Sequence, residues 1–291
     1  MLTLLSRSTT LKRLASQYGM ATPRSFGRRF IAGERVEDAI EAARALQARG
    51  LGVTLDFLGE SVATTEQAMA AAGEYQRLID VVVASGVERN LSLKLSQIGL
   101  AIDRATCVDN MRRILDPAKR HDFFVRIDME GSAYTEVTLE VLETLWGLDY
   151  HNIGIVLQSY LYRTERDLRR MNELGVRVRL VKGAYRESAS VAYQLKEDVD
   201  GAFLRQMRLL LDHGVSPAFA THDEALLREI RDYAAERHVS SDRYEFQMLY
   251  GVRRDLQASL RADGYRMRVY VPFGREWFPY FMRRLGERKE N

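Results

Sequence analysis

Two adjacent arginines, Arg283 and Arg284, stand near the end of the sequence in the stretch WFPYFMRRLGER. If Pro279 lies in the first turn of a helix, where its missing N–H costs no hydrogen bond, the arginines share one face with Tyr280 and Glu287. Neighbouring guanidinium groups repel each other unless an anion lies between them, and each can bind a carboxylate through two parallel N–H groups. The spacing therefore predicts a carboxylate clamp on a helix that begins near residue 275, with a solvated helix face as the alternative.

Further polar side chains alternate with apolar ones along short β-rich segments. Lys94, Asp128 and Tyr270 lie on the polar faces of three such segments, and Gln158 and Arg179 on two others. A buried charge costs several kcal/mol unless it is paired, and a purely structural barrel interior would consist mainly of Val, Ile and Leu. We therefore predict that the polar faces line a functional site. The alternative is a structural ion-pair network, which we expect to account for Arg177 and Arg266.

Eight β-rich segments alternate with helical patterns and must position these side chains. They are residues 52–59, 90–96, 123–129, 153–159, 176–183, 217–222, 244–251 and 266–274. Between them, apolar residues recur at helical spacing, and Thr164 and Asp223 are the predicted N-caps of two helices. Eight strand–helix units with right-handed crossovers predict an α/β fold, the (β/α)8 barrel, with its site at the C-terminal ends of the strands. We predict one barrel domain, residues 36–291, after an N-terminal helical segment, residues 1–35.

The composition narrows the classes of protein that need to be considered. The 291 residues carry a net charge of +3, which gives no support to nucleic-acid binding. Cys107 is the single cysteine, so the chain has no internal disulfide and no cysteine metal cluster. No apolar run is long enough to cross a membrane. Residues 1–33 contain no acidic residue, which is typical of an organellar targeting segment, although a basic surface helix is the favoured interpretation.

Seven segments of this sequence together resemble the proline dehydrogenase family. In order they are LSLKLSQIG, VRIDMEGSAYTE, VLQSYLYRTERDL, RLVKGAYRE, FATHDEAL, EFQMLYGV and YVPFGREWFPYFMRRLGER. The same order is found in monofunctional proline dehydrogenases and in the proline dehydrogenase domain of bifunctional proline utilisation proteins. The resemblance extends from about Phe30 to Glu287, and one small departure is Ser159, where some relatives have Ala.

This resemblance implies a distorted (β/α)8 barrel with its eighth helix at the rim of the active site. It also implies that FAD accepts a hydride from L-proline, that Δ1-pyrroline-5-carboxylate is the product, and that a quinone takes the electrons. No Gly-x-Gly-x-x-Gly turn follows a strand, so side chains and strand-end loops would have to hold the flavin. The expected location is cytoplasmic, with peripheral contact at the inner face of a bacterial membrane; the alternative is the mitochondrial matrix.

The resemblance also assigns roles to individual residues. Asp128 and Arg179 are the implied catalytic residues: Asp128 would fix Tyr270 or accept a proton, and Arg179 would stabilise the anionic reduced flavin. The implied substrate-binding residues, which hold the proline carboxylate or surround the ring, are Lys94, Tyr160, Leu249, Tyr270, Arg283, Arg284 and Glu287. The implied flavin contacts are Met129, Gln158, Arg179, Val181, Lys182, Gly183, Ala184, Thr221, His222, Asp223, Gln247 and Leu249.

Three other interpretations of these residues remain open at this point. His222 and Asp223 match no metal-ligand spacing, so no metal site is expected. Lys94 and Lys182 at strand ends are typical of a lyase or aldolase that forms a Schiff base, but that interpretation leaves the arginine pair unexplained. A barrel that only binds an amino acid or a partner would have no need for every charged group of the redox site.

Overall fold

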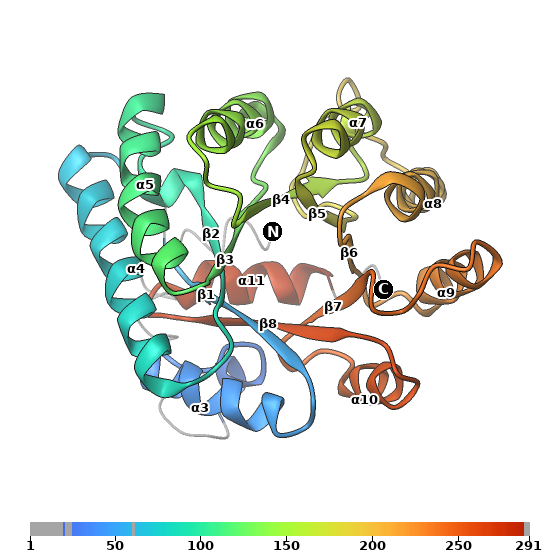
Figure 1. The fold of residues 1–291 in the computed structure, drawn as a ribbon, viewed down its shortest axis with the longest axis horizontal. Coiled ribbons are helices and arrows are strands. Elements are labelled where there is room, and N and C mark those ends of the chain that lie inside the picture. Colours follow the sequence, from blue (N-terminus) through green and yellow to red (C-terminus); the bar gives the residue numbers. More distant parts are fainter. Residues whose placement is uncertain (1–19, 21–24, 60–61, 288–291) are drawn as a thin grey trace.

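A closed barrel of eight parallel strands, in the order β1 to β8, forms the centre of the molecule (Figure 1). In this computed structural model the described residues are 20, 25–59 and 62–287, except for the side chains of 285–287. All eight predicted strands are confirmed. They are β1 Gly52–Phe57, β2 Asn90–Lys94, β3 Phe124–Asp128, β4 Ile153–Gln158, β5 Arg177–Val181, β6 Ala218–Ala220, β7 Glu245–Leu249 and β8 Met267–Phe273.

An outer ring of helices surrounds the barrel (Figure 1). Its members are α3 Val36–Gln47, α4 Thr65–Ser85, α5 Arg104–Arg120, α6 Ser132–Gly147, α7 Thr164–Leu174, α8 Lys196–His213, α9 Glu224–Glu236 and α10 Arg254–Ala262. Two short 3-10 helices are η1 Phe26–Arg29 and η2 Leu95–Ile98. The helix α3, which precedes β1, packs against both β8 and β1 and so occupies the ring position that a helix after β8 would normally take.

The helix that does follow β8 is α11, Trp277–Glu287, and it lies across the barrel instead of in the ring (Figure 1). It packs through Trp277 and Tyr280 in an apolar cluster that contains Tyr270 of β8 and Leu58, which follows β1. These contacts hold α11 at the C-terminal ends of the strands. The expected distortion of the barrel, with the last helix at the rim of the site, is confirmed.

Local boundaries follow the sequence predictions with three corrections. Asp223 is the N-cap of α9, where its carboxylate accepts a hydrogen bond from the amide of Ala225. Thr164 is not an N-cap, because α7 has Arg163 there and the Thr164 hydroxyl instead donates to the carbonyl of Gln158 at the end of β4.

The other two corrections concern α11. The helix begins at Trp277 and not near residue 275, although Pro279 still lies in its first turn. Tyr280 was expected on a polar face with the arginines, but it is buried together with Phe278 and Phe281. Its ring is large enough to pack in the apolar cluster of α11, which explains the difference.

The barrel interior is polar in two layers, and the lower layer is structural. Near the N-terminal ends of the strands, the guanidinium of Arg268 pairs with Glu245 at 2.9 Å and Glu88 at 2.6 Å. Arg266 also pairs with Glu245, at 3.5 Å, while the side chain of Arg177 lies against the ring of Phe124 outside the site. The ion-pair network is therefore confirmed for Arg266, but the prediction is wrong for Arg177, which is exposed and forms no ion pair with the described residues. The opposite faces of the strands are apolar and pack on the helices, as predicted.

The described part of the N-terminal segment packs directly on the barrel. The amide of Ala32 donates to the carbonyl of Pro272 at 2.9 Å, and the indole of Trp277 donates to Glu34 at 3.0 Å. In residues 25–35 the only helical element is η1. The boundary at residue 35 stays a prediction, and the proposed targeting segment lies largely outside the described residues.

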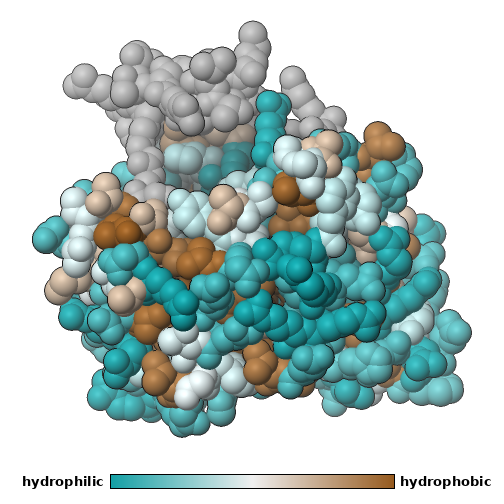
Figure 2. All heavy atoms as spheres, turned by 90° about the horizontal axis from the view of Figure 1, so that it is seen from above, coloured by the Kyte–Doolittle hydropathy of each residue, from teal (hydrophilic) through white to brown (hydrophobic). Residues whose placement is uncertain are grey.

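None of the described helices combines the length and the apolar character that crossing a bilayer requires. On the α6 and α7 side the surface is mainly hydrophilic, with small separate apolar areas (Figure 2). Single apolar side chains on a surface are normal in monomeric proteins.

Candidate active site

Lys94 and two buried carboxylates form the floor of the candidate site. Lys94 ends β2 and is paired in register with Asp128, which ends β3. Its ammonium nitrogen lies 3.3 Å from Asp56 of β1 and 3.3 Å from Asp128. Burial alone would lower the pKa of Lys94, but the two carboxylates outweigh burial and raise the pKa above its usual value. The amine therefore stays protonated.

Asp128 joins this floor to β5 and β8. The phenol of Tyr270 donates to its Oδ2 at 2.7 Å, which confirms the predicted hydrogen bond, and Arg179 donates to its Oδ1 at 2.9 Å. Arg179 also donates to Ser92 at 3.1 Å, and its guanidinium lies 5.4 Å from the centre of the Tyr270 ring. Burial, followed by the charge of Asp128, raises the pKa of Tyr270 well above its usual value. The phenol therefore keeps its proton and acts as the donor.

Two residues of the site, Asp56 and Tyr185, have no individual role in the sequence predictions. Asp56 is fully buried, and burial raises the pKa of its carboxyl although Lys94 opposes the shift. The alternation along β1 predicts Asp56 on the polar face of that strand, and the structure confirms this position beside Lys94. Tyr185 lies in the loop after β5, near enough to Lys94 and Arg283 for their charges to act on its hydroxyl. In the sequence it is only a tyrosine in a loop, so no periodicity marks it.

The arginine pair of α11 spans the mouth above these strand ends. Arg283 and Arg284 lie with their guanidinium carbons 5.9 and 5.1 Å from the centre of the Tyr280 ring. The charge of Arg283 acts on Lys94 from β2, and that of Arg284 acts on His222 after β6. Arg283 is exposed and Arg284 is partly buried, so the carboxylate clamp stays a prediction. The side chain of Glu287, predicted beside them, lies outside the described residues.

His222 and Leu249 meet between β6 and β7. The Nε2 atom of His222 accepts a hydrogen bond from the amide of Leu249 at 3.1 Å. Burial and the charge of Arg284 lower the pKa of His222 to about 4. The imidazole is therefore neutral at physiological pH, and the bond at Nε2 leaves the proton on Nδ1.

Lys182, at the end of β5, is enclosed by carboxylates. Its ammonium lies 2.7 Å from Asp200 and 2.9 Å from Asp223. Burial would raise the pKa of Asp223, but hydrogen bonds from Lys182 and Lys196 outweigh it and lower the pKa to about 2. This cluster of two lysines and two carboxylates at the rim of the barrel includes two of the predicted flavin contacts, Lys182 and Asp223.

Close backbone packing marks the ends of β4 and β5. Gly183 has a φ of +126°, and a Cβ atom there would lie 2.5 Å from the ring of Tyr160. Only glycine allows this contact. The side-chain amide of Gln158 donates to the carbonyl of Glu130 at 2.8 Å. The remaining predicted flavin contacts at or after strand ends are Met129, Val181, Ala184 and Thr221, while Gln247 lies in the middle of β7.

Two polar groups inside the barrel, on β5 and β7, suit a flavin ring. Among the described residues, the buried Nε of Arg179 and the buried Oε1 of Gln247 have no hydrogen-bond partner. One is a donor and the other an acceptor, and both belong to strands on the same side of the barrel. The edge of a flavin ring presents acceptor atoms and an N–H group, so one buried donor and one buried acceptor could both bond to it. Three His, Cys, Asp or Glu side chains that could hold a metal do not come together in the described part of the chain.

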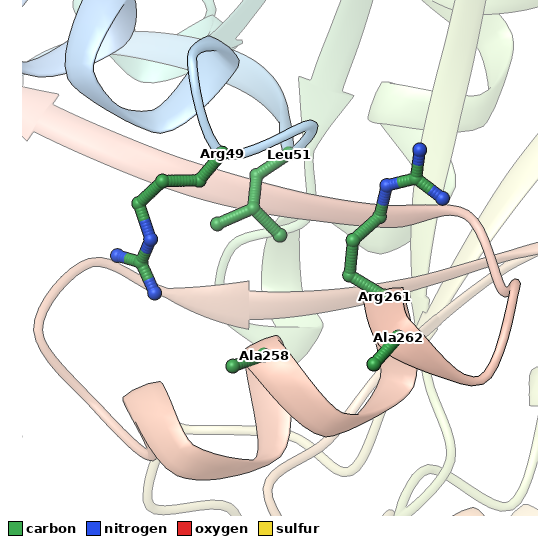
Figure 3. Close-up of a pocket in the computed structure, with 5 residues that line it drawn as sticks. All are labelled: Arg49, Leu51, Ala258, Arg261 and Ala262. Atoms are coloured by element: carbon green, nitrogen blue, oxygen red, sulfur yellow. The ribbon is translucent and has the colours of Figure 1, made fainter.

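A surface depression of about 440 Å³ lies at the other end of the barrel (Figure 3). Leu51 lies between the flanking side chains of Arg49 and Arg261, with Ala258 and Ala262 of α10 below them. Leu51 immediately precedes β1, so the depression is at the N-terminal end of the strands. Since (β/α)8 enzymes carry their active sites at the opposite end, we do not assign this depression to the candidate active site.

The sequence of this chain matches a known protein family and several of its members. The family model described as proline dehydrogenase matches residues 39–291. This chain belongs to the proline dehydrogenase family. Proline dehydrogenase 1 of Bacillus subtilis subsp. natto is 40% identical over 287 residues, which cover 99% of this chain and 94% of that protein. Proline dehydrogenase of Deinococcus radiodurans is 41% identical over 267 residues, 90% of this chain and 86% of that protein.

A solved structure supports the fold of this family member. Proline utilization A from Bdellovibrio bacteriovorus, inactivated by N-propargylglycine, superimposes with a TM-score of 0.84 at 22% identity. The match covers 98% of this chain and 38% of that chain. At such low identity the likeness shows the barrel architecture alone.

Family membership and geometry together exclude the lyase alternative. A Schiff base forms only from a neutral amine. Asp56 and Asp128 keep Lys94 protonated, and Lys182 is bound between two carboxylates. The interpretation as a Schiff-base lyase or aldolase is therefore wrong for this member of the family.

Proposed function

We propose that this protein oxidises L-proline to Δ1-pyrroline-5-carboxylate, with FAD as the hydride acceptor and a quinone as the final oxidant. One observation carries the proposal beyond the family name. Arg283 of α11 lies near enough for its charge to act on Lys94, which forms a buried cluster with Asp128 and Tyr270 at the mouth of the barrel. Such a site combines cations that can bind the carboxylate of a substrate with a packed aromatic ring that can contact a small apolar substrate ring.

The substrate carboxylate is held mainly by the arginines. The single charge of Lys94 is already shared between Asp56 and Asp128, so it is compensated before any ligand arrives. Arg283 and Arg284 therefore supply the net attraction for an anion, and Lys94 supplies a hydrogen-bond donor. Fixing the carboxylate at one end of proline sets the orientation of the ring carbon that loses hydride.

Asp128 serves chiefly to position other groups. Its two oxygens accept from Tyr270, Arg179 and Lys94. Because these donors already use both oxygens, the geometry favours fixing the Tyr270 ring over accepting the amine proton of proline. Tyr160 and Leu249 complete the ring pocket in this proposal, as the family resemblance implies.

FAD supplies the hydride acceptor when it is bound. Arg179 and Gln247 would meet the polar edge of its ring, because each has a buried polar atom without a protein partner in the described structure. Neutral His222 and the backbone at Gly183 would line the same side of the barrel. The positive charge of Arg179 suits the anionic reduced form.

The proposed partners are L-proline and a membrane quinone, with neither a metal nor nucleic acid. We propose a cytoplasmic location with peripheral contact at the inner face of a bacterial membrane, and the mitochondrial matrix as the alternative. The quinone oxidant follows from the family resemblance. The proposed contact with a membrane follows in turn, since quinones of this kind are confined to membranes.

Colour and reduction of the purified protein test the proposal. The preparation should be yellow, and anaerobic titration with L-proline should bleach the flavin absorption band. A soluble quinone should then restore it, and NADH should not reduce the flavin. A preparation that stays colourless after FAD is added, or a flavin that only NADH reduces, would contradict the proposal.

A further inference from the structure

Residues 182–195, which join β5 to α8, form a loop that we name the strap. Its first part packs on Tyr160, whose amide donates to the carbonyl of Lys182 at 2.9 Å. Its last part returns to the same residue, since the amide of Tyr193 donates to the carbonyl of Tyr160 at 2.8 Å. Both ends of the strap are therefore attached to the loop after β4, and so is Ala189, whose carbonyl accepts from the hydroxyl of Tyr162 at 2.9 Å. An attachment to a different element must come from another residue.

Glu187 provides that attachment by bonding to α6. One carboxylate oxygen accepts from the amide of Ser132 at 2.7 Å, and the other bonds to the Ser132 hydroxyl. Ser132 is the first residue of α6, and the N-cap residue Gly131 has no side chain to cap the helix. The first turn of α6 also contains no acidic residue. A carboxylate is stabilised at the positive end of a helix, so Glu187 acts as the cap of α6 from another segment.

This attachment is close in sequence to a residue of the candidate site. Tyr185 precedes Glu187 by two residues, and its hydroxyl lies within the electrostatic influence of Lys94 and Arg283. Two residues of extended chain span at most about 7 Å. A shift of the strap at Glu187 must therefore move Tyr185 relative to the cations that would bind the substrate.

We propose that Glu187 is a positioning residue for substrate binding: its two bonds to Ser132 hold the strap, with Tyr185 in it, in place against Tyr160. The inference rests on the proposed oxidation of proline. Because the contact is made by a charged acceptor with two donors, it is strong enough to restrict a loop. Its loss should weaken substrate binding much more than it slows the chemical step.

The test uses Glu187→Ala and Glu187→Gln in the FAD-loaded protein. The probe is L-tetrahydrofuran-2-carboxylate, which has the ring and the carboxylate of proline but no amine, and its binding is measured by the change in the flavin spectrum. We expect its Kd to rise roughly three- to tenfold, as is typical when a bound ligand loses a well-placed contact. The KM for proline should rise in parallel, while kcat at saturation and the FAD content stay within about twofold.

Asp103→Ala is a matched control. Asp103 caps α5 with the same pair of bonds, from the amide and the hydroxyl of Thr106 at 2.8 and 2.6 Å, but it caps its own helix and touches no strap. This variant should lower Tm without changing the Kd of the probe, because alanine cannot cap a helix. A Kd that rises equally in Asp103→Ala would mean that any lost helix cap disturbs the site, which would overturn the positioning role.

A double-mutant cycle separates positioning from general damage. In a Tyr185→Ala background, Glu187→Ala should have no further effect on probe affinity; an effect that persists there would overturn the proposal. If Glu187→Ala does not fold, Ser132→Ala removes one of the two bonds and should raise the Kd less, in the same direction, and an unchanged Kd would again overturn it. A wild-type flavin that proline does not reduce would refute the proposed function instead.

Discussion

Replacement of Lys94 by methionine would leave Asp56 and Asp128 buried without the cation that they share. Breaking a buried ion pair by removing one partner costs about 3–5 kcal/mol, and here one ammonium serves two carboxylates at 3.3 Å. For a domain of this size each kcal/mol lowers Tm by roughly 2–4 °C. Lys94→Met should therefore lower Tm by roughly 6–20 °C near neutral pH.

The loss of folding stability in Lys94→Met should also depend on pH in a defined direction. Burial already raises the folded-state pKa of Asp56 above its unfolded value, and removal of Lys94 raises it further. The folded variant then binds more protons than the unfolded chain, so its stability is greatest below about pH 4 and is lost as pH rises through the folded-state pKa. Between the unfolded-state and the folded-state pKa of Asp56, the stability of Lys94→Met should fall by up to about 1.4 kcal/mol per pH unit relative to the wild type.

Thermal unfolding from pH 4.5 to 8 measures both effects. Lys196→Met is the control, because Lys196 also pairs with two carboxylates but its side chain is 55% exposed. An exposed ion pair contributes about 0–1 kcal/mol. Asp56→Asn combined with Lys94→Met should restore part of the lost stability. A Lys94→Met variant that loses no more stability than the control, or loses the same amount at every pH, would refute the reasoning.

Three further predictions concern the mouth of the barrel. Arg283→Met or Arg284→Met should raise the KM for proline roughly ten- to hundredfold with FAD still bound, since a charge-assisted contact is worth about 1.5–3 kcal/mol; an unchanged KM would identify a solvated helix face. Tyr270→Ser should raise kcat/KM for hydroxyproline relative to proline, by up to about 1–3 kcal/mol in selectivity, although absolute activity should fall; an unchanged ratio would mean that the ring does not touch the substrate. The pKa of His222 in the folded protein is about 4, below its unfolded value, so its contribution to stability is lost as pH falls from about 6.5 to 4. His222→Gln, which keeps an acceptor for the amide of Leu249, should remove up to about 3 kcal/mol of that acid sensitivity in urea titrations at pH 7 and 4.5.

The alternation of polar and apolar residues was enough to predict the eight strands and the end of the barrel that carries the site. Side chains of a strand point alternately to its two faces, so residues such as Lys94 and Asp128 had to share the interior once the barrel closed. The helical spacing of Arg283 and Arg284 likewise depended only on local geometry. These features follow from the chain's own periodicity.

Tertiary packing alone decided which of those polar residues meet, and where α11 lies. Arg179 and Arg268 have the same side-chain chemistry on the polar faces of β5 and β8, yet one bonds to Asp128 in the site and the other closes the lower layer with Glu245. That difference depends on their heights in the barrel, which pairing between distant strands sets. Likewise α3 rather than α11 fills the outer ring, because α3 packs on β8 and β1. Periodicity describes the faces of each element, but partners far apart in the sequence decide which face meets which.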